Sequence, residues 1–312
     1  EVSNQQEEWL RTIDVATVDL NTMVEDFLDS SKLRSGRLRI DRRSLNIRQV
    51  FDGVRVMLKR KADARQIRLI EKIAPGLPTV FADEEKVRRI VMNLATNAIK
   101  FSPTGSDITL AATRADNGDI EVSVSDHGQG LSESDLQSLF ERFKQLPNAM
   151  SPSVKGFGLG LNIARQLVWY NLGEISVEST AGVGSTFRFT LPPSQPEVII
   201  DRFLDRLHEC EDCPNLIAAL HVRLLNDESN PNFLQHLLGV STRPSDISLL
   251  DADERSCLLF GPTESVEKWV ERLESELHDS DDLGPTSLEH KVEVSIIGSW
   301  SFADERDLAR AT

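Results

Sequence analysis

The 312-residue sequence predicts an α+β fold arranged in two domains. Amphipathic segments with a helical period are interleaved with pairs of strand-like segments joined by short turns, such as "DITLAATR" and "DIEVSVSD" around "ADNGD". Because the strands come in pairs, a layered α+β arrangement is favoured over a regular βαβ repeat. The Pro-rich stretch "PPSQPE" at 192–197 predicts a linker, which we place at residues 193–198 between a first domain and a second small α+β domain at 199–312.

Composition and charge exclude several classes of protein. Hydrophobic residues make up 39% and charged residues 27% of the chain, as is typical of a globular protein. The formal net charge of −15 disfavours binding to nucleic acid, whose phosphates need a basic surface. No apolar run approaches the ~20 residues that a membrane span requires, so no membrane contact is expected within this chain. The "CEDC" pair at 210–213 lacks further zinc ligands, and a reducing cytoplasm fits the three cysteines.

Each remaining element is predicted from periodicity and turn signals. In the first domain we expect helices near 46–63, 83–100, 132–140 and 160–173, with strands at "IRLIEKI", "EISVEST" and "STFRFTLP" besides the pair above. In the second domain we expect helices at "IDRFLDRLHEC", near 231–240 and at "ESVEKWVERLESEL", and strands at "NLIAALHVRLL", "DISLL", "SCLLF" and "KVEVSIIGSW".

The N-terminal residues 5–33 are expected to form one long helix. Apolar side chains recur at alternating spacings of three and four, as in a heptad seam with one polar member: Leu10, Ile13, Thr17, Leu20, Val24 and Phe27. An ordinary amphipathic surface helix has the same periodicity. In either case the apolar seam must face a partner.

Three alternating glycines in "KGFGLGL", Gly156, Gly158 and Gly160, precede an amphipathic helix. Such a loop is a candidate phosphate site, although glycines also serve tight turns and close helix packing. A Rossmann-type dinucleotide site is disfavoured, because no parallel βαβ unit encloses the glycines.

A polar stripe in "RRIVMNLATNAIKFSP" gives a second candidate. Asn93 and Asn97 are four residues apart on one helical face, and Lys100 follows almost one turn later. Amide oxygens are ligands for Mg²⁺, and an ammonium group suits phosphates. A solvent-facing stripe would show the same spacing.

Two further motifs follow in order. In "VSDHGQGLS", Asp126 ends an apolar strand and Gly128 and Gly130 come directly after it. A carboxylate there can accept a hydrogen bond from the exocyclic amine of adenine, while the glycines allow close approach of the ring; an ordinary Asp-containing turn is the alternative. The segment "LFERF" then contributes Phe140 and Phe143.

Taken together, these motifs resemble the N, G1, F and G2 boxes of bacterial sensor histidine kinases, and the resemblance covers about residues 1–192. It implies a Bergerat-type two-layer α/β sandwich at 37–192 that holds ATP beneath a lid. By this resemblance Asn97 ligates Mg²⁺ with support from Asn93, Lys100 meets the phosphates and Asp126 binds the adenine amine. The other implied nucleotide-site residues are Gly128, Gly130, Phe140, Phe143, Gly156, Gly158, Leu159 and Gly160, the last four at the lid hinge and the helix start.

The resemblance also bears on the reaction and on the N-terminal helix. Related ATPases that hydrolyse ATP carry a Glu four residues before the metal-binding Asn, whereas this chain has Asn93 there, an amide that cannot take a proton. Phosphoryl transfer to a protein is therefore favoured over hydrolysis. Residues 1–36 resemble the second helix of the family's dimerisation hairpin, which implies a homodimer through a four-helix bundle. The hairpin's acceptor histidine has no counterpart here, so we expect it upstream of Glu1 and expect no self-phosphorylation at that position.

The second domain resembles a degenerate GGDEF domain with a nucleotide-cyclase-like fold, related to the ferredoxin-like arrangement. "LLDADERSCLLF" takes the place of the signature hairpin, where Asp251 and Ala252 replace the glycines that admit phosphates. Cyclase activity is therefore not expected, and a regulatory role is. An unrelated small α+β domain remains the alternative.

The expected function is that of the catalytic core of a two-component histidine kinase in the bacterial cytoplasm, as part of a larger sensor, with ATP and Mg²⁺ as cofactors. The phosphoryl group would pass to a histidine and then to the receiver domain of a response regulator. The alternative is a nucleotide-binding pseudokinase scaffold that acts through protein–protein contacts.

Overall fold

The computed structural model describes residues 38–142, 144, 158–209, 214, 216–225, 242–251, 255–278 and 292–301, with single helical positions at 6, 9, 13, 17, 20, 24, 27, 28, 31, 32, 234 and 238. The predicted seam residue Leu10 lies outside this set. The seam residues Ile13, Leu20, Val24 and Phe27 are helical and exposed. Among the described helices, none is long and apolar enough to span a membrane.

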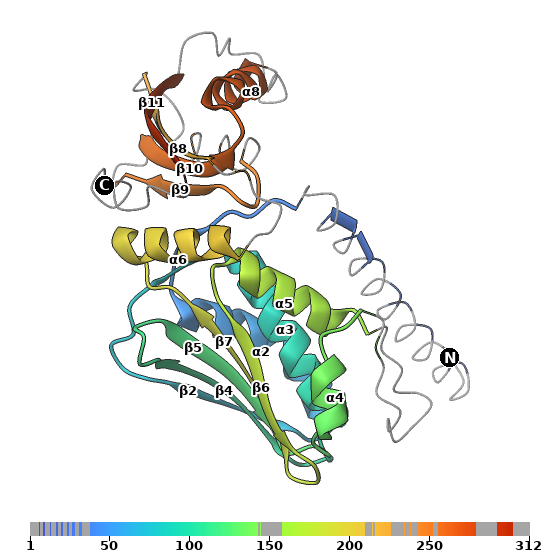
Figure 1. Ribbon diagram of the computed structural model, residues 1–312. Coiled ribbons are helices and arrows are strands. Elements are labelled where there is room, and N and C mark those ends of the chain that lie inside the picture. The colour runs from blue at the N-terminus through green and yellow to red at the C-terminus, as the bar shows by residue number, and fades with distance from the viewer. Residues whose placement is uncertain are drawn as a thin grey trace.

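The first domain is built on a five-stranded mixed sheet with the order β2-β4-β5-β7-β6 (Figure 1). Its strands are β2 (Arg68–Ile73), β4 (Asp107–Arg114), β5 (Ile120–Asp126), β6 (Ile175–Thr180) and β7 (Gly184–Leu191). The strands β2 and β4 run parallel, and each of the other neighbouring pairs is antiparallel. The two predicted strand pairs, β4–β5 and β6–β7, are therefore present.

Helices cover one face of this sheet, as Figure 1 shows. They are α2 (Ile47–Ala64), α3 (Glu84–Phe101) and α5 (Gly160–Tyr170), with the short α4 (Glu133–Ser138) at one end. Their apolar faces and the inward residues of the strands form one core, which includes Phe51, Ile90, Leu94, Leu167 and Phe189. The predicted two-layer α/β sandwich is confirmed.

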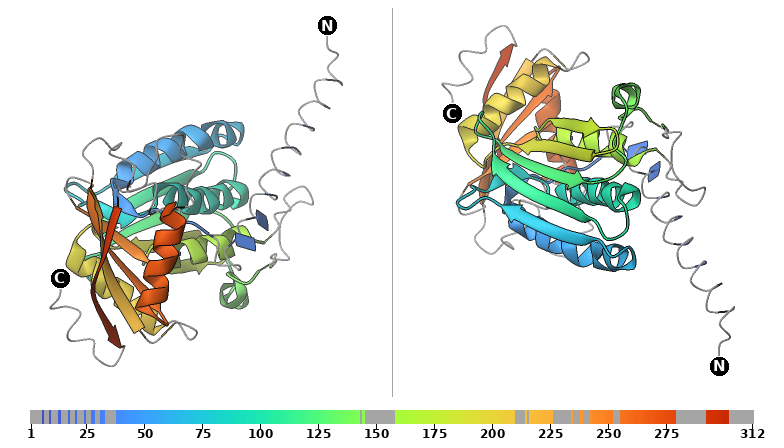
Figure 2. Two further views of the ribbon diagram at one scale, coloured as in Figure 1. Left: turned by 90° about the horizontal axis from the view of Figure 1, so that it is seen from above. Right: turned by 90° about the horizontal axis from the view of Figure 1, so that it is seen from below.

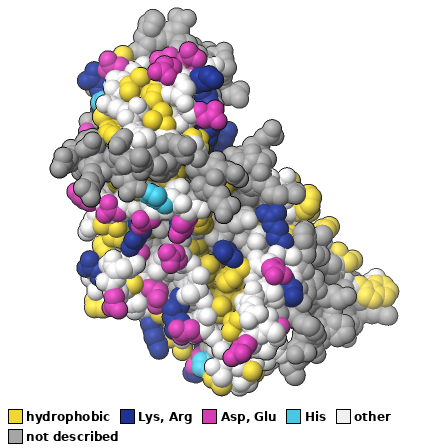
Figure 3. Space-filling view, viewed as in Figure 1, with side chains coloured by type: hydrophobic (Ala, Val, Ile, Leu, Met, Phe, Trp, Pro, Cys, Tyr) yellow, Lys and Arg dark blue, Asp and Glu magenta, His cyan; other side chains and the backbone are white. Residues whose placement is uncertain are grey.

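The opposite face of the sheet carries charged side chains. Arg188 on β7 contacts Glu121 on β5 at 3.5 Å and Glu178 on β6 at 2.8 Å. These cross-strand pairs suit a solvated face, because opposite charges on neighbouring strands attract across the sheet. On the side drawn in Figure 3, acidic and basic side chains are interspersed over the first domain.

A bridge to a small two-stranded sheet and the start of a helix occupy the region that the sequence predicted as a linker. β1 (Arg43–Leu45) pairs with β3 (Val80–Ala82), and Val80 also forms a bridge with Pro193. Pro196 then occupies the first turn of α6 (Pro196–His208), so most of residues 193–198 belong to regular structure and not to a free linker. A proline suits a helix start because its missing N–H would be unpaired there. The third proline of "PPSQPE", Pro196, is therefore a helix signal.

The second domain contains a four-stranded antiparallel sheet with the order β11-β8-β10-β9. Its elements are β8 (Leu216–Leu224), β9 (Ile247–Leu250), β10 (Ser256–Thr263), α8 (Val266–His278) and β11 (Val292–Ser301). One face packs on α8 and on the helical positions Leu234 and Leu238. This strand order is that of the ferredoxin-like fold, as predicted. Figure 1 shows α6 lying between this sheet and the first domain, and in the view from above the second domain covers α6 (Figure 2).

Candidate functional site

Helix α3 carries the predicted polar stripe. The side-chain amide of Asn93 donates to the carbonyl oxygen of Gly160, 3.1 Å away, and so joins α3 to the start of α5. Asn97 is half-buried, and its side chain has no hydrogen-bond partner among the described residues. The ammonium of Lys100 lies over the ring of Phe101, 5.1 Å from its centroid. An amide without a protein partner is available to a ligand or an ion.

The C-terminal end of α3 is fixed by Arg65, which the sequence analysis missed. Its guanidinium donates to the carbonyl oxygens of Ile99 at 2.5 Å, Lys100 at 2.6 Å and Ser102 at 3.1 Å. These contacts satisfy carbonyls that a helix end otherwise leaves unpaired, and a cation there complements the helix dipole. Arg65 therefore sets the position of Lys100.

Asp126 ends β5 close to the end of α3. Its Oδ1 accepts a hydrogen bond from the backbone N–H of Gly128 at 2.8 Å. Burial raises the pKa of this carboxyl above its ordinary value, while hydrogen bonds from the backbone N–H groups of Gly128 and Ser185 act in the opposite direction. The half-buried carboxylate can still accept a further donor, because its two oxygens together offer about four acceptor sites.

Both glycines after Asp126 are required by close approach. A Cβ atom on Gly128 would lie 2.8 Å from Oδ1 of Asp126 and 2.9 Å from the carbonyl oxygen of Phe101. Gly130 has φ +66°, and a Cβ atom there would lie 2.0 Å from the carbonyl oxygen of Thr180. The D-x-G-x-G loop is therefore wedged between the end of α3 and the β6–β7 turn.

Phe140 is half-buried and packs on the core of the first domain. Asn162 in the first turn of α5 donates to the carbonyl oxygen of Phe140 at 2.9 Å and accepts from Nε of Arg142 at 3.2 Å. The guanidinium of Arg165 stacks over the Phe140 ring at 5.8 Å. Sequence reasoning missed Asn162 and Arg165. Phe143 and Gly156, both predicted site residues, lie outside the described residues.

The remaining glycines shape the start of α5. Gly158 has φ +68°, a conformation that favours glycine, and Gly160 is the first residue of the helix. The buried Leu159 precedes it as the N-cap residue, and its side chain makes no capping hydrogen bond. Within the described part of the chain, the backbone N–H groups of the first turn are therefore available to an anion, and no acidic side chain of this turn competes for them.

The predicted metal ligand is an amide and not a carboxylate. In the described part of the chain, no three His, Cys, Asp or Glu side chains come together as a metal site. A magnesium ion at Asn97 would thus take one protein oxygen and rely on phosphate and water oxygens for the rest, which is a usual arrangement for this ion. The half-buried, unbonded amide of Asn97 fits that role. Cys210 and Cys213 lie outside the described residues.

Helix α3 brings the motifs together. The glycine loop contacts α3 at Asn93, and the D-x-G-x-G loop contacts it at the carbonyl of Phe101. Asn97 lies midway, four residues from each contact, which is close to one turn in either direction. The arrangement places an open helix N-terminus, an unbonded amide, an ammonium and a half-buried carboxylate along one helix, as a nucleoside triphosphate with its metal ion would require.

Comparisons with known proteins agree with this geometry. Residues 82–195 match the family described as histidine kinase-, DNA gyrase B- and HSP90-like ATPase. The chain is 32% identical over 174 residues to the adaptive-response sensory kinase SasA of Synechococcus elongatus, covering 56% of this chain and 44% of SasA. It is 33% identical over 195 residues to the sensor protein GacS of Pseudomonas syringae pv. syringae, covering 61% of this chain and 22% of GacS.

A solved structure shows the same fold. The crystal structure of full-length ShkA in complex with AMPPNP matches with a TM-score of 0.52 and 26% identity, covering 62% of this chain and 40% of that chain. The chain spans less than half the length of the curated relatives named above. The matched part of the chain is thus similar to the ATP-binding domain of histidine kinases, both in sequence and in fold.

Proposed function

We propose that this chain is the catalytic core of a two-component sensor histidine kinase. It would bind ATP with Mg²⁺ and transfer the γ-phosphoryl group to a histidine, from which an Asp of a response regulator would receive it. The observation that carries the proposal is the position of Asn97, unbonded to described residues and one turn from each of two glycine-loop contacts on α3. The kinase relatives support the reaction class.

Asp126 would select adenine. Gly128 N–H occupies one face of the carboxylate, which leaves acceptor capacity for the exocyclic amine of the base. Because Gly128 has no Cβ atom, its backbone can lie between the Asp126 carboxylate and the carbonyl of Phe101 without a clash. A purine that has a carbonyl in place of the amine would present an acceptor to an acceptor and would leave the carboxylate unpaired.

The phosphates would lie between α3 and the first turn of α5. Open backbone N–H groups at the start of α5 would bind phosphate oxygens, and the positive end of the helix dipole would favour their charge. Lys100 would offset charge from the side of α3. Mg²⁺, held by Asn97 and by phosphate oxygens, would supply further charge neutralisation during transfer.

Transfer is favoured over hydrolysis by the residue at position 93. Asn93 uses its amide N–H to bind the carbonyl of Gly160, and an amide does not accept a proton from water. Catalysis would therefore rest on positioning and charge stabilisation, with the attacking imidazole supplied by the acceptor helix.

The N-terminal segment would supply the dimer contact. Ile13, Leu20, Val24 and Phe27 keep 48–60% of their surface exposed in the single chain. An apolar seam with this spacing fits a four-helix bundle formed with a second copy. The second domain would be a regulatory domain that resembles a degenerate GGDEF domain, with the β9–β10 hairpin in place of the signature hairpin.

Nucleotide competition tests the pocket. Because Asp126 is expected to bind the adenine amine, ITP should compete with ATP at least about tenfold less well, and Asp126→Asn should narrow that difference. Asp116→Asn in the β4–β5 turn, where the side chain is exposed, is the matched control and should bind as the wild type does. Equal competition by ITP would remove Asp126 from the base pocket.

A transfer assay tests the reaction. The chain is mixed with radiolabelled ATP, Mg²⁺ and the isolated dimerisation hairpin of a related sensor kinase. The proposal expects a label on the hairpin that is stable to alkali and lost in acid, as phosphohistidine is. Steady release of inorganic phosphate with no labelled protein would indicate an ATPase instead.

A further inference from the structure

Helix α6 is shared by both domains. Its apolar side chains Ile199, Ile200, Phe203 and Leu207 are each at most 5% exposed. They form one hydrophobic cluster that joins the first domain, through Phe81 and Leu172, to the second domain. The members from the second domain are Ile217, Ala219, Ile247 and Phe260, with Leu249, Leu258 and Trp300 packed against them.

These second-domain residues belong to one face of the sheet. Ile217 and Ala219 alternate along β8 with Ala218 and Leu220, which point to the α8 side. A two-layer domain of this fold needs helices on one face alone, yet here the second face is also apolar and is covered by α6 and the first domain. Separation of the domains would expose that whole face to water.

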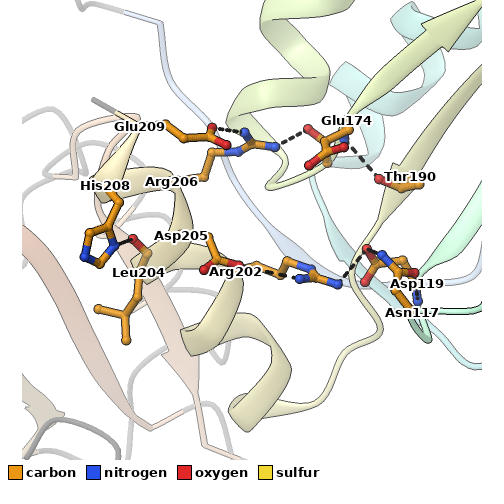
Figure 4. Close-up of polar contacts among 11 residues, drawn as sticks. Asn117, Asp119, Glu174, Thr190, Arg202, Leu204, Asp205, Arg206, His208 and Glu209 are labelled. Atoms are coloured by element: carbon orange, nitrogen blue, oxygen red, sulfur yellow. Dashed lines mark hydrogen bonds and ion pairs between the residues drawn. The ribbon is translucent and has the colours of Figure 1, made fainter. Parts of the chain in front are cut away.

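Polar contacts close the rim of this interface (Figure 4). Arg202 of α6 contacts Asp119 of the first domain at 3.1 Å, and the carboxylate of Asp119 is 5% exposed. Arg206, about one helical turn further on, donates to the carbonyl oxygen of Gly173 at 2.5 Å. Gly173 itself admits no Cβ atom, because such an atom would lie 1.8 Å from the carbonyl oxygen of Thr190.

Arg42 joins three segments at one point. Its Nε donates to the carbonyl oxygen of Tyr170 at the end of α5, 2.6 Å away. The other two guanidinium nitrogens donate to the carbonyl oxygens of Asp246 at 3.0 Å and Pro244 at 2.8 Å, just before β9. Arg42 is 7% exposed and lies in the segment that leads from the N-terminal helix into the first domain. Breaking any of these bonds would leave a buried charge short of partners.

Helix α5 runs from this junction to the glycine loop. Its C-terminal end holds Tyr170 and Asn171, and Asn171 also accepts a hydrogen bond from the backbone N–H of Asp83 at 2.8 Å. Its N-terminal end holds Gly160, which Asn93 binds. The buried residues between them are packed in the core, so the helix moves as one rigid rod. A displacement of α5 at Tyr170 would therefore also displace Gly160 at its other end.

We propose that residues 196–301 are a permanently docked regulatory domain in cis, which acts on the glycine loop by fixing the far end of α5 through α6 and Arg42. The interface lies between two parts of the same chain. An apolar face of the second-domain sheet packs against α6 and the first domain, and hydrogen bonds from arginine side chains to backbone carbonyls lie at its edge. The effect on nucleotide affinity rests on the proposed function; the docking and the fixing of α5 do not.

The test uses the whole 312-residue chain with Arg42→Gln, and Arg43→Gln as the matched control. Arg43 is the next residue, its side chain is exposed, and it forms an ion pair with Asp41. Backbone hydrogen exchange is followed in residues 199–207, 242–250 and 163–170. Arg42→Gln should speed exchange at least tenfold in all three segments, whereas Arg43→Gln should stay within twofold of the wild type. Unchanged exchange in Arg42→Gln would overturn the proposal.

The second measurement is ATP affinity in the presence of Mg²⁺. Arg42→Gln should raise the Kd at least fivefold, with Arg43→Gln unchanged. Faster exchange in 199–207 and 242–250, with no change in 163–170 or in Kd, would mean a docked domain that does not act on α5, which contradicts the proposal. A wild type that binds no ATP would defeat the proposed function, while exchange in 163–170 would still decide the coupling.

A milder variant covers the case in which Arg42→Gln does not fold. Arg202→Gln removes one rim contact and leaves Arg42 intact, and Arg223→Gln, at an exposed pair with Glu293 on the second-domain sheet, is its control. Arg202→Gln should speed exchange in 199–207 and 163–170 at least threefold. Equal exchange in Arg202→Gln and Arg223→Gln would overturn the proposal.

Discussion

The side-chain amide of Asn93 donates a hydrogen bond to the carbonyl oxygen of Gly160, and this 3.1 Å contact ties the polar helix α3 to the first residue of α5. The two residues are 67 positions apart in the sequence. Each belongs to a separate motif, so the contact places the amide stripe beside the glycine loop. Asn97 lies on the next turn of α3, about one helical turn from this contact with the N-terminus of α5.

Replacing Asn97 tests the metal position. Asn97→Ala should abolish Mg²⁺-dependent ATP binding while leaving the thermal unfolding midpoint within about 2 °C, because the amide bonds to no described residue. Isothermal titration with ATP and Mg²⁺ measures the effect. Thr96→Ala, one residue earlier on the same helix, is the control and should bind normally; unchanged affinity in Asn97→Ala would remove Asn97 from the metal site.

Gly128→Ala tests the close approach beside Asp126. The added Cβ atom would lie 2.8 Å from Oδ1 of Asp126 and 2.9 Å from a backbone oxygen, so the carboxylate or the end of α3 must shift. We expect a destabilisation of about 1–3 kcal/mol, as for other overpacked sites, together with at least tenfold weaker ATP binding. Chemical denaturation and nucleotide titration measure the two effects.

Gly105→Ala is the comparison for that experiment. Gly105 has φ +82° and nothing within 4 Å of an added Cβ atom, so alanine there would introduce backbone strain without a clash. We expect a loss of about 1–2 kcal/mol there and normal ATP affinity. Equal losses of affinity in both variants would mean that general destabilisation, and not the geometry at Asp126, explains the effect of Gly128→Ala.

Asn162→Ala tests the contact between α5 and the segment that contains Phe140. The variant removes a 2.9 Å bond to the Phe140 carbonyl and the acceptor of Arg142, each worth about 0.5–1.5 kcal/mol. Since Asn162 holds Phe140 and Arg142 against the start of α5, where the phosphates would bind, we expect faster ATP dissociation, by about three- to tenfold. Stopped-flow displacement of a fluorescent nucleotide measures it, and Gln166→Ala on the same helix serves as the control. An unchanged dissociation rate would make the contact purely structural.

Asp246 gives a pH dependence of stability. Burial raises the pKa of this carboxyl to about 6, despite the backbone N–H of Arg243 and the nearby guanidinium groups of Arg272 and Arg42. The folded chain therefore binds a proton between about pH 4 and 6 that the unfolded chain releases, given an ordinary carboxyl pKa near 3.9. This contribution to the free energy of unfolding is present at low pH and is lost as pH rises through 6.

Comparison with Asp246→Asn isolates that effect. Relative to this variant, the wild type should lose about 2–3 kcal/mol of unfolding free energy between pH 4 and 7, because other titrating groups cancel in the difference. Urea unfolding at several pH values measures it. Parallel stability profiles for the two proteins would show that Asp246 keeps its ordinary pKa when folded.

Much of the first domain follows from local sequence signals. The strand pairs β4–β5 and β6–β7 are bounded by Gly-containing turns, and α3 begins at Asp83, whose side chain accepts from the N–H of Lys86. Such signals act over a few residues and are visible in the sequence. The three-residue strand β3 was not predicted, because it owes its extended form to pairing with β1, far away in sequence.

Contacts made across the fold explain what the sequence did not predict in the site and at the interface. Arg65 reaches the end of α3 across 34 residues, and Arg42 reaches Pro244 across 202. Neither shows a local pattern, since an isolated arginine in a charged segment is most often solvated. The motif order predicts the candidate nucleotide site, whereas Arg65 and Arg42, which fix the surrounding elements, depend on tertiary packing.

The most direct test of the account is a calorimetric titration of the chain with ATP, first with Mg²⁺ and then with EDTA. We predict saturable binding at one site per chain that is at least tenfold weaker without the metal. A folded sample that binds no ATP in either condition would contradict the proposed pocket, and the motifs on α3 and α5 would then serve the structure alone.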